Sequence, residues 1–371
     1  MGNLNVIDLF SGVGGLSLGA ARAGFHVAGS VEIDPIAAEY HALNFPQTQH
    51  LLEDVGNISG AELLKRCKLN QRELSGLIGG PPCQGFSLIG RRDELDPRNQ
   101  LFMHFFRLVA ETRPAFYVAE NVPGILNGAS ADFVRQALGQ IPSNYTLLAP
   151  IKIRASTFGA PTTRTRVFFI GFDPKKISDL SVESFSPSSE WQGTTVSDAL
   201  KGLPNVSADW QEESQSWRKI KPVTSSQFHE RARGVIPPGV GNREAVLHSA
   251  KNLVSGFLGT RHSDETVARF SKLRPGEVDK VYRSPRLDPK GLCPTIRAGT
   301  NSDKGSYQAV RPIHPRHPRV ISPREAARLQ GFPDWFLFHP TKWHSFRQIG
   351  NSVSPIVAER VLSVIFNALK R

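Results

Sequence analysis

Short apolar runs and helical stretches alternate along the first 172 residues of the chain. Apolar runs at residues 5–10, 26–31, 74–78 and 116–119 each lead into a glycine-rich or acidic segment. Residues 35–44 and 101–111 have the composition and spacing of helices. This alternation predicts an α/β fold, with a doubly wound, mainly parallel sheet and helices on both faces.

The regular pattern ends at about residue 175. The segment that follows contains Trp191, Trp210 and Trp217 but shows little sustained periodicity up to about residue 310. Regular patterning resumes at Ser322, which is followed by a proline and a helical run, as expected of a helix N-cap. A last helix is expected from about residue 355 to 369. We expect a first domain at 1–175, a smaller irregular domain at 190–310, and a C-terminal segment at 320–371 that returns to the first domain.

Composition indicates a globular protein with a basic surplus. Hydrophobic residues make up 39% and charged residues 21% of the 371 positions. We find no run of about 18 apolar residues and no N-terminal leader pattern, so we expect a cytoplasmic protein that neither spans nor crosses a membrane. The net charge of +12 favours a polyanionic partner, and residues 190–311 hold 19 Lys and Arg against 13 Asp and Glu.

The cysteines and histidines do not predict a disulfide framework or a metal site. Cys67, Cys83 and Cys293 are odd in number and far apart, and are most simply reduced thiols. His314, His317 and His344 show no recurring ligand spacing. We therefore expect no metal, and we interpret Trp335 and Phe336 as packing residues.

A glycine-rich loop follows the first apolar run. Its glycines are Gly12, Gly14 and Gly15, and Ser17 stands where a dinucleotide-binding fingerprint would have its third glycine, which disfavours a nicotinamide-dependent oxidoreductase. Acidic residues stand at the ends of later runs, with Glu32 placed to bind a ribose diol and Asp54 to bind an adenine amino group. This layout suits S-adenosylmethionine. The alternative is that these acids are solvated loop residues.

Residues 79–87, Gly-Gly-Pro-Pro-Cys-Gln-Gly-Phe-Ser, place Cys83 on a stiff, glycine-flanked turn after an apolar run. Two prolines fix the backbone, and the glycines let a ligand approach closely. A thiol is the strongest intrinsic nucleophile among side chains. The turn therefore favours Cys83 as a nucleophile over an inert buried cysteine.

Six segments together resemble the motifs of the DNA (cytosine-5)-methyltransferases, in the family's order. They are residues 8–15 (DLFSGVGG), 79–87, 120–122 (ENV), 164–166 (RTR), 324–330 (REAARLQ) and 348–353 (QIGNSV). Pro294-Thr295-Ile296-Arg297 also looks like a family feature. One departure is Thr162, where the family usually has glutamine, and it puts the local DNA or loop contacts in doubt.

The resemblance implies a class I S-adenosylmethionine-dependent methyltransferase, a Rossmann-like domain with a target-recognition domain between Arg166 and Ser322. Cys83 would attack carbon 6 of cytosine. Glu120 would donate a proton to the ring, which requires that burial keep it protonated near neutral pH. Arg166 would hold oxygen 2 of the base, and Arg164 would position the nucleophile and a phosphate.

The resemblance also implies two binding sets. The residues expected to hold S-adenosylmethionine, and S-adenosylhomocysteine as product, are Asp8, Phe10, Ser11, Gly12, Gly14, Gly15, Leu16, Glu32, Ile33, Asp54, Val55, Pro81, Asn351, Ser352 and Val353. Those expected to contact double-stranded DNA are Gln84, Ser87, Arg91, Arg92, Arg98 and Arg297. Residues 88–97 would close over the site once the cytosine has rotated out of the duplex.

Sequence alone leaves other functions open. A transfer-RNA-methylating branch of the family usually carries a Cys-Phe-Thr signature, which this chain lacks. A non-catalytic DNA-binding relative is disfavoured because Cys83, Glu120, Arg164 and Arg166 are all present. We expect a monomer that methylates one DNA sequence, either beside a separate restriction endonuclease or as an orphan epigenetic enzyme.

Overall fold

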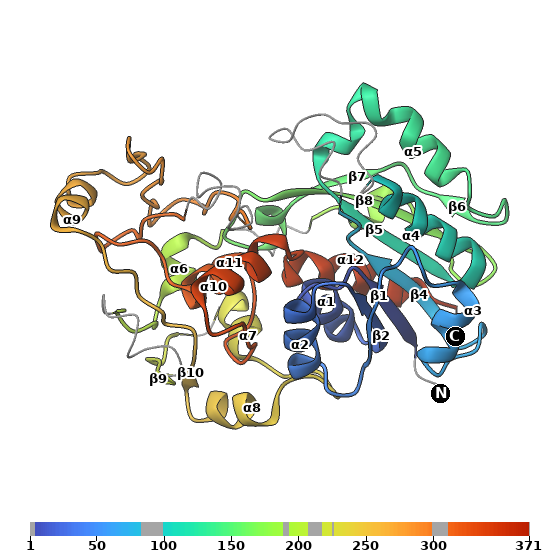
Figure 1. Cartoon of the computed structure of the whole chain (residues 1–371), viewed down its shortest axis with the longest axis horizontal. Helices are drawn as coiled ribbons and strands as arrows, with labels where there is room; N and C mark the ends of the chain where they lie inside the picture. The colour runs from blue at the N-terminus through green and yellow to red at the C-terminus, as the bar shows by residue number, and fades with distance from the viewer. Residues whose placement is uncertain are drawn as a thin grey trace.

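One large sheet organises the molecule. The computed structural model describes residues 4–82, 99–187, 193–206, 217–224, 226–298 and 311–370. Within them, eight strands form a sheet in the order β3-β2-β1-β4-β5-β8-β6, with β7 also paired to β8 (Figure 1). The strands are β1 (Asn5–Leu9), β2 (His26–Glu32), β3 (Gln49–Leu52), β4 (Leu74–Gly79), β5 (Phe116–Asn121), β6 (Thr146–Leu147), β7 (Ile151–Arg154) and β8 (Thr165–Phe172).

The first five strands are parallel, as the alternating pattern predicted. In register, Leu9 of β1 lies between Val31 of β2 and Gly79 of β4. Parallel strands buried on both faces are nearly all apolar, and every residue of β1 and β5 is buried. This register brings the carboxyl ends of β1, β2, β4 and β5 to one edge of the sheet.

The remaining strands run the other way. Strand β8 is antiparallel to β5, with Glu120 opposite Phe168 and Asn121 opposite Val167. Strands β6 and β7 then pair antiparallel with β8. The sheet is therefore mixed at one side, and β8 begins beside the carboxyl end of β5.

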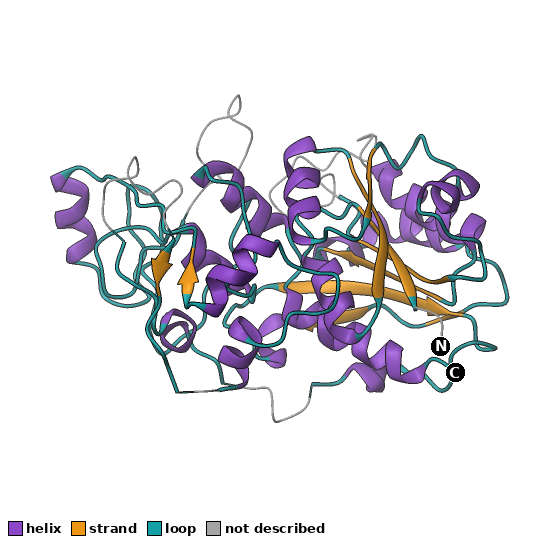
Figure 2. Ribbon diagram, turned by 90° about the horizontal axis from the view of Figure 1, so that it is seen from below, coloured by secondary structure: helices purple, strands orange, loops and turns teal. Residues whose placement is uncertain are grey.

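Helices cover both faces of the sheet (Figure 2). Side chains alternate along the strands, so that Val6, Phe116 and Phe168 join one hydrophobic core and Ile7, Tyr117 and Phe169 join the other. The helices in this part are α1 (Gly15–Ala23), α2 (Pro35–Asn44), α3 (Gly60–Arg66), α4 (Asn99–Thr112) and α5 (Ala131–Leu138).

The C-terminal segment packs against the beginning of the chain. It contains α10 (Pro323–Gln330), α11 (Lys342–Asn351) and α12 (Pro355–Ala368). Helix α12 lies against α1, where Gly19 leaves room for Ala358, and the two marked termini lie near each other in Figure 1. The predicted cap at Ser322 is confirmed, because its hydroxyl accepts a hydrogen bond from the Glu325 amide and the Glu325 side chain returns to the Ser322 amide.

By length and composition alone, Lys342–Ala368 could cross a membrane, although polar and charged residues interrupt it and it is not a continuous apolar run. However, 67% of its apolar window is buried inside the protein, and Ser352 separates α11 from α12. We interpret it as core structure. Trp335 and Phe336, which precede it, are buried as expected.

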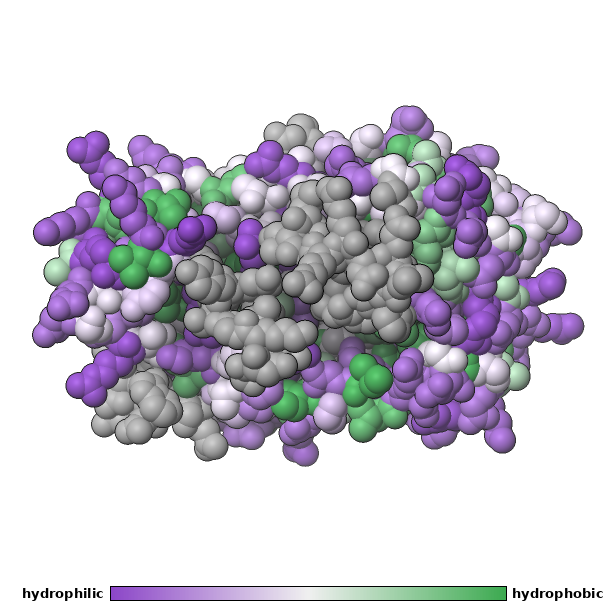
Figure 3. All heavy atoms as spheres, turned by 45° about the horizontal axis from the view of Figure 1, so that its top comes forward, coloured by the Kyte–Doolittle hydropathy of each residue, from purple (hydrophilic) through white to green (hydrophobic). Residues whose placement is uncertain are grey.

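The region from residue 193 to residue 298 has little regular structure. Its two-stranded sheet is formed by β9 (Arg218–Lys219) and β10 (Leu253–Val254), above a small core that includes Ile220 and Phe257. Its helices are α6 (Val196–Leu200), α7 (Gln227–Arg233), α8 (Arg243–Ala250) and α9 (Asp264–Ser271). Figure 3 shows hydrophilic side chains over most of the visible described surface of the molecule, with hydrophobic ones scattered among them.

Candidate active site

The predicted site residues that the structure describes gather at the carboxyl edge of the parallel strands. The loop after β1 begins at Phe10, Glu32 is the last residue of β2, and Glu120 and Asn121 end β5. Ligands bind at this edge in open α/β sheets because the loops there diverge. Cys83, Gln84, Ser87, Arg91, Arg92 and Arg98 lie outside the described residues.

The glycine-rich loop requires glycine at two positions. Gly14 has a φ of 102°, and a Cβ there would overlap the ring of Phe45. A Cβ on Gly15 would overlap the carbonyl oxygen of Val353. The loop is thus clamped between α2 and the segment after α11, which brings Ser352 and Val353 to the cofactor loop over a long sequence distance.

Glu32 holds the open side of this loop in place. Its carboxylate accepts hydrogen bonds from the backbone amides of Gly12 (2.8 Å), Ile33 (2.9 Å) and Asp34 (2.9 Å). Burial raises the pKa of Glu32, while these amides lower it. A Cβ on Gly12 would meet no atom within 4 Å, so the backbone at this position faces open space.

A buried polar chain beneath the loop was missed by the sequence reasoning. The hydroxyl of Ser17 donates to the Asp8 carboxylate at 2.6 Å and lies 3.0 Å from Nε2 of His41. Burial raises the pKa of Asp8 to about 7 and holds that of His41 well below its ordinary value. Asp8 therefore supports the loop from inside the protein. The only signal in the sequence was a serine at the third-glycine position of the fingerprint.

Apolar and acidic groups continue along this edge. Ile33 is 65% exposed directly after β2, which is unusual for isoleucine. After β3, the Asp54 carboxylate accepts a hydrogen bond from the Gly56 amide (2.8 Å), and Val55 is buried. An exposed aliphatic face and a nearby carboxylate can bind a flat, amine-bearing ring.

Glu120 is buried and paired with an arginine from the neighbouring strand. Its Oε1 lies 2.8 Å from Nε of Arg166 on β8, and both side chains are largely shielded from water. The antiparallel pairing of β5 and β8 produces this contact between residues 46 positions apart. An acid and a guanidinium therefore meet at the edge of the sheet, as expected from the motifs at residues 120–122 and 164–166.

The turn that leads to Cys83 is fastened to the same strand end. The side-chain amide of Asn121 donates to the carbonyl of Pro81 (3.2 Å), and Gly80 lies so close to Glu120 that a Cβ would come within 3.3 Å of Oε2. Cys83 follows two residues after Pro81. The Asn121 contact was missed because nothing in the sequence relates positions 81 and 121.

The other two cysteines are sealed in the core. Cys67 and Cys293 are free thiols with 3% and 0% of their surfaces exposed, and burial raises the pKa of both. A buried thiol with a raised pKa supplies little thiolate at neutral pH. Neither is suited to nucleophilic chemistry.

Arg164 reaches a different partner from Arg166. It precedes β8, is 3% exposed, and its Nη1 donates to the carbonyl of Gly350 on α11 at 2.9 Å. Burial lowers the pKa of Arg164, and the nearby Arg166 charge adds to this. A Cβ on Gly350 would come within 2.5 Å of the Ala298 amide nitrogen. Gly350 is thus where two of the six motif segments, 164–166 and 348–353, meet the backbone next to the exposed Arg297.

Thr162 is fully buried, and its side chain does not face the surface. Its hydroxyl accepts a hydrogen bond from the Arg164 amide (3.3 Å), and its backbone pairs with Cys293. The residue that departs from the family pattern therefore lies in the support beneath Arg164.

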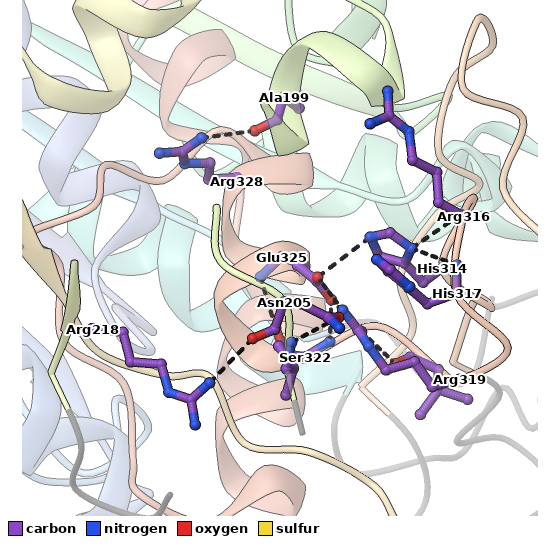
Figure 4. Close-up of polar contacts among 12 residues, drawn as sticks. Ala199, Asn205, Arg218, His314, Arg316, His317, Arg319, Ser322, Glu325 and Arg328 are labelled. Carbon is purple, nitrogen blue, oxygen red and sulfur yellow. Dashed lines mark hydrogen bonds and ion pairs between the residues drawn. The ribbon is translucent and has the colours of Figure 1, made fainter. Parts of the chain in front are cut away.

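Two fully buried arginines of α10 join the C-terminal segment to the irregular region. Arg328 forms a two-pronged ion pair with Asp334 (2.7 and 2.6 Å) and donates to the carbonyls of Ala199 and Lys201; Figure 4 shows the bond to Ala199. Arg324 donates to the carbonyl of Ser255. The REAARLQ segment is therefore a structural joint, a role that its sequence does not reveal.

No group of three or more histidine, cysteine or acidic side chains in the described ranges is arranged to hold a metal ion. His314 faces Glu325, and burial lowers its pKa to about 4. The sequence prediction of no metal remains a prediction.

A family model for C-5 cytosine-specific DNA methylases matches residues 4–367. The chain belongs to this family. The Type II methyltransferase M.XorII of Xanthomonas oryzae pv. oryzae is 39% identical over 98% of this chain and 85% of that protein. M1.HphI of Haemophilus parahaemolyticus, also a Type II methyltransferase, is 34% identical over 98% of this chain and 87% of its own length. The recognised resemblance and the assignment as a DNA (cytosine-5)-methyltransferase are thus confirmed.

Solved structures agree with the assignment. An E. coli prophage protein described as a DNA modification methyltransferase superposes with a TM-score of 0.89 at 52% identity, covering 99% of both chains. The Dnmt2 methyltransferase of S. pombe has a TM-score of 0.63 at 17% identity and shows the shared fold alone. The predicted Rossmann-like methyltransferase fold is confirmed, and membership of the family implies S-adenosylmethionine as methyl donor and DNA as substrate.

Proposed function

We propose that this methyltransferase modifies carbon 5 of a flipped-out cytosine within one specific double-stranded DNA sequence, through a covalent bond between Cys83 and carbon 6. One observation carries the proposal. Glu120 and Arg166 meet at a strand edge to which the turn preceding Cys83 is fastened by Asn121. The turn that leads to the candidate nucleophile is thereby held beside an acid and a cation.

Covalent attack at carbon 6 makes carbon 5 of cytosine reactive enough to be methylated. Carbon 5 of cytosine is a weak nucleophile, and thiolate addition at carbon 6 pushes electron density onto it as an enamine. Carbon 5 can then attack the methyl group, after which loss of its proton and elimination of the thiol restore the ring. Cys83 is the candidate because Cys67 and Cys293 are sealed in the core.

Glu120 and Arg166 would stabilise the charged ring. A proton shared between the Glu120 carboxyl and nitrogen 3 would neutralise the charge that addition creates. Arg166, already 2.8 Å from Glu120, would orient that carboxyl and hold oxygen 2 of the base. Arg164, anchored on Gly350, would fix the start of β8 and thereby the position of Arg166.

The edge near β1 and β2 fits S-adenosylmethionine, which when bound supplies an electrophilic methyl group on a sulfonium. The open backbone at Gly12 leaves space for a ligand, and the buried Ser11 hydroxyl has no hydrogen-bond partner among the described residues. Ile33 offers an exposed apolar face for the adenine. We assign the ribose to Glu32 and the adenine amine to Asp54, with Phe10, Leu16, Val55, Pro81 and Asn351–Val353 around them.

The DNA would lie between this edge and the irregular region, and we propose residues 190–310 as the target-recognition domain. Rotating one base out of the stack costs a few kcal/mol, which phosphate contacts help to offset. Arg297 is exposed next to the Gly350 junction and is a candidate for such a contact. We further propose a monomer that acts in the bacterial cytoplasm at the nucleoid, within a restriction-modification system or as an orphan enzyme.

Bisulfite sequencing tests the proposal directly. The protein, its Cys83→Ser variant and Cys67→Ala as a matched cysteine control would each be expressed in a host that lacks cytosine methylation. We expect methylated cytosines at one recurrent motif with the wild type and Cys67→Ala, and none with Cys83→Ser. No methylation from a folded, cofactor-binding wild type would redirect the assignment to RNA or to a binding-only relative.

Glu120→Gln tests the acid. Loss of a positioned proton donor lowers turnover by about 10²- to 10⁴-fold, and the pH dependence of kcat should change with it. Glu62→Gln, an exposed carboxylate on α3, is the control. Turnover of Glu120→Gln equal to that of the control at every pH would remove Glu120 from the mechanism.

A further inference from the structure

A cavity of about 380 Å³ lies outside the catalytic edge and has no role in the mechanism above. One wall is formed by the end of α6 and the residues after it, up to Asn205, and the other by residues 314–319 with Glu325 behind them. Figure 4 shows this second wall, with Arg319 and His314 grouped around Glu325 and Arg316 beside them.

The cavity presents more free positive than free negative charge. Lys201 and Arg316 line it and are both exposed. Of its acids, Glu325 is neutralised by Arg319, whereas Asp198 accepts hydrogen bonds from the amide and hydroxyl of Thr195 (2.9 and 2.6 Å) and keeps its charge. Arg316 makes one weak contact, from Nη2 to the Ser197 hydroxyl at 3.4 Å. Two cations are therefore available to an anion that enters.

Arg319 compensates the acid behind the second wall. It is 8% exposed, and its Nη1 and Nη2 donate to the two carboxylate oxygens of Glu325 at 2.9 and 2.7 Å. Its Nε is buried and makes no hydrogen bond in the described part of the chain. Because this nitrogen is shielded from solvent, a ligand in the cavity does not reach it, and the role of Arg319 is to hold and neutralise Glu325.

The walls are fixed before any ligand arrives. Arg328 holds the carbonyls of Ala199 and Lys201, and Nη1 of Arg218 donates to the Asn205 carbonyl at 3.1 Å. The opposite wall is held because Nδ1 of His314 accepts hydrogen bonds from the amides of Arg316 (3.0 Å) and His317 (3.1 Å). A preorganised site loses little entropy on binding.

The cavity is connected to the catalytic edge by a short segment. The amide of Val196, at the start of α6, donates to the Gly291 carbonyl (3.0 Å), and two residues later Cys293 pairs with Thr162 beneath Arg164. The cavity wall and the support of Arg164 are therefore joined through one short stretch of backbone.

We propose that this cavity binds a phosphate group of the DNA backbone through Arg316 and Lys201. The proposal rests on the proposed function, since it gives the DNA substrate a further anchoring point. Two exposed cations match phosphate oxygens and carry no base information. It is a binding site for the strand, separate from the base pocket.

The test measures DNA affinity against salt. Fluorescence anisotropy with a duplex carrying the motif found by bisulfite sequencing would compare wild type, Arg316→Ala, Arg316→Lys and Lys65→Ala, an exposed lysine of α3 as charge control. Loss of one phosphate contact should weaken binding about tenfold at low salt and lower the slope of log K against log[salt] by about 1. Arg316→Lys should restore most of both.

Inorganic phosphate distinguishes the two sources of the anion. In calorimetry without DNA, it should bind the wild type weakly and Arg316→Ala not at all, and it should compete with the duplex only in the wild type. If phosphate binds but Arg316→Ala matches Lys65→Ala in DNA affinity and slope, the site takes a free anion and the proposal is wrong. The same match without phosphate binding also overturns it. Failure of the proposed function would look different, since the wild type itself would then methylate no DNA in the bisulfite experiment.

Discussion

The sheet and the irregular region supply hydrogen-bond donors to their backbone carbonyls in different ways. In the sheet, backbone carbonyls accept hydrogen bonds from neighbouring strands, and the register alone places Glu120 opposite Phe168. In residues 193–298, regular pairing is scarce, and arginine side chains take over. Arg286 donates to the carbonyls of Phe270 (2.9 Å) and Leu273 (3.1 Å), much as Arg328 does for Ala199 and Lys201.

This difference indicates which residues can be substituted in each region. A buried strand tolerates exchange of one apolar residue for another, because its hydrogen bonds are made by backbone groups. A loop held by a guanidinium depends on one long side chain and its fixed fork of donors. The strands beneath the catalytic edge thus tolerate exchange of apolar residues, although the edge itself depends on Gly14, Gly15 and the side chain of Asn121. The irregular region is sensitive at a few buried arginines.

Arg328→Ala should be the most damaging change to this arrangement. It leaves Asp334, 1% exposed, without its two-pronged partner and frees two backbone carbonyls. Breaking a buried pair by removing one partner costs about 3–5 kcal/mol of unfolding free energy. Chemical denaturation would measure the loss.

Arg135→Ala is the matched control for this change. Its pair with Asp132 is equally short at 2.7 Å, but the two side chains are 77% and 79% exposed. Such a pair contributes about 0–1 kcal/mol. Equal losses from Arg328→Ala and Arg135→Ala would show that the joint does not stabilise the fold.

Gly350→Ala should disturb the contact between the two regions. The new methyl group would press on the backbone at Ala298, which cannot move aside as a side chain can, and overpacking of this kind costs about 2–3 kcal/mol. Because Arg164 and Arg297 meet at the same point, the Kd for DNA should rise more than that for cofactor. Gly128→Ala, where a Cβ meets no atom within 4 Å, is the control; a cofactor Kd that rises as much as the DNA Kd would contradict the interpretation.

Asp8→Asn tests the buried hydrogen-bonded chain of Asp8, Ser17 and His41 beneath the glycine-rich loop. Burial raises the pKa of Asp8 to about 7 from an ordinary 3.8, so the folded state binds a proton that the unfolded state has released. Stability contributed by this proton is present at low pH and is lost as pH rises towards and through 7. Between pH 5.5 and 7.5, the wild type should lose about 2 kcal/mol relative to Asp8→Asn, measured by urea unfolding at each pH. Asp132→Asn, on the surface, should show no such relative change, and a pH-independent difference for Asp8→Asn would contradict the buried assignment.

Sequence reasoning succeeded where local rules decide the outcome. The helix at Pro35–Asn44 has the predicted bounds, the cap at Ser322 forms as expected, and Glu32 and Glu120 do stand at strand ends. Apolar alternation, proline position and capping chemistry act over a few residues and can be read directly.

It failed where two distant segments must meet. Asn121 binds Pro81, Arg164 binds Gly350, and Arg328 binds Ala199, over separations of 40, 186 and 129 residues. No local pattern encodes these pairs. The arginines of α10 show the difficulty best, because a charged helix is ordinarily expected at the surface.

The clamp on the glycine-rich loop has a consequence for how the protein is made. Gly15 emerges early from the ribosome, but Val353, against which it packs, and α12, which covers α1, follow more than 300 residues later. A growing chain therefore carries an unfinished cofactor loop through nearly all of its synthesis. Methylation can begin only once translation has passed this point, so no partial product of interrupted synthesis should mark DNA.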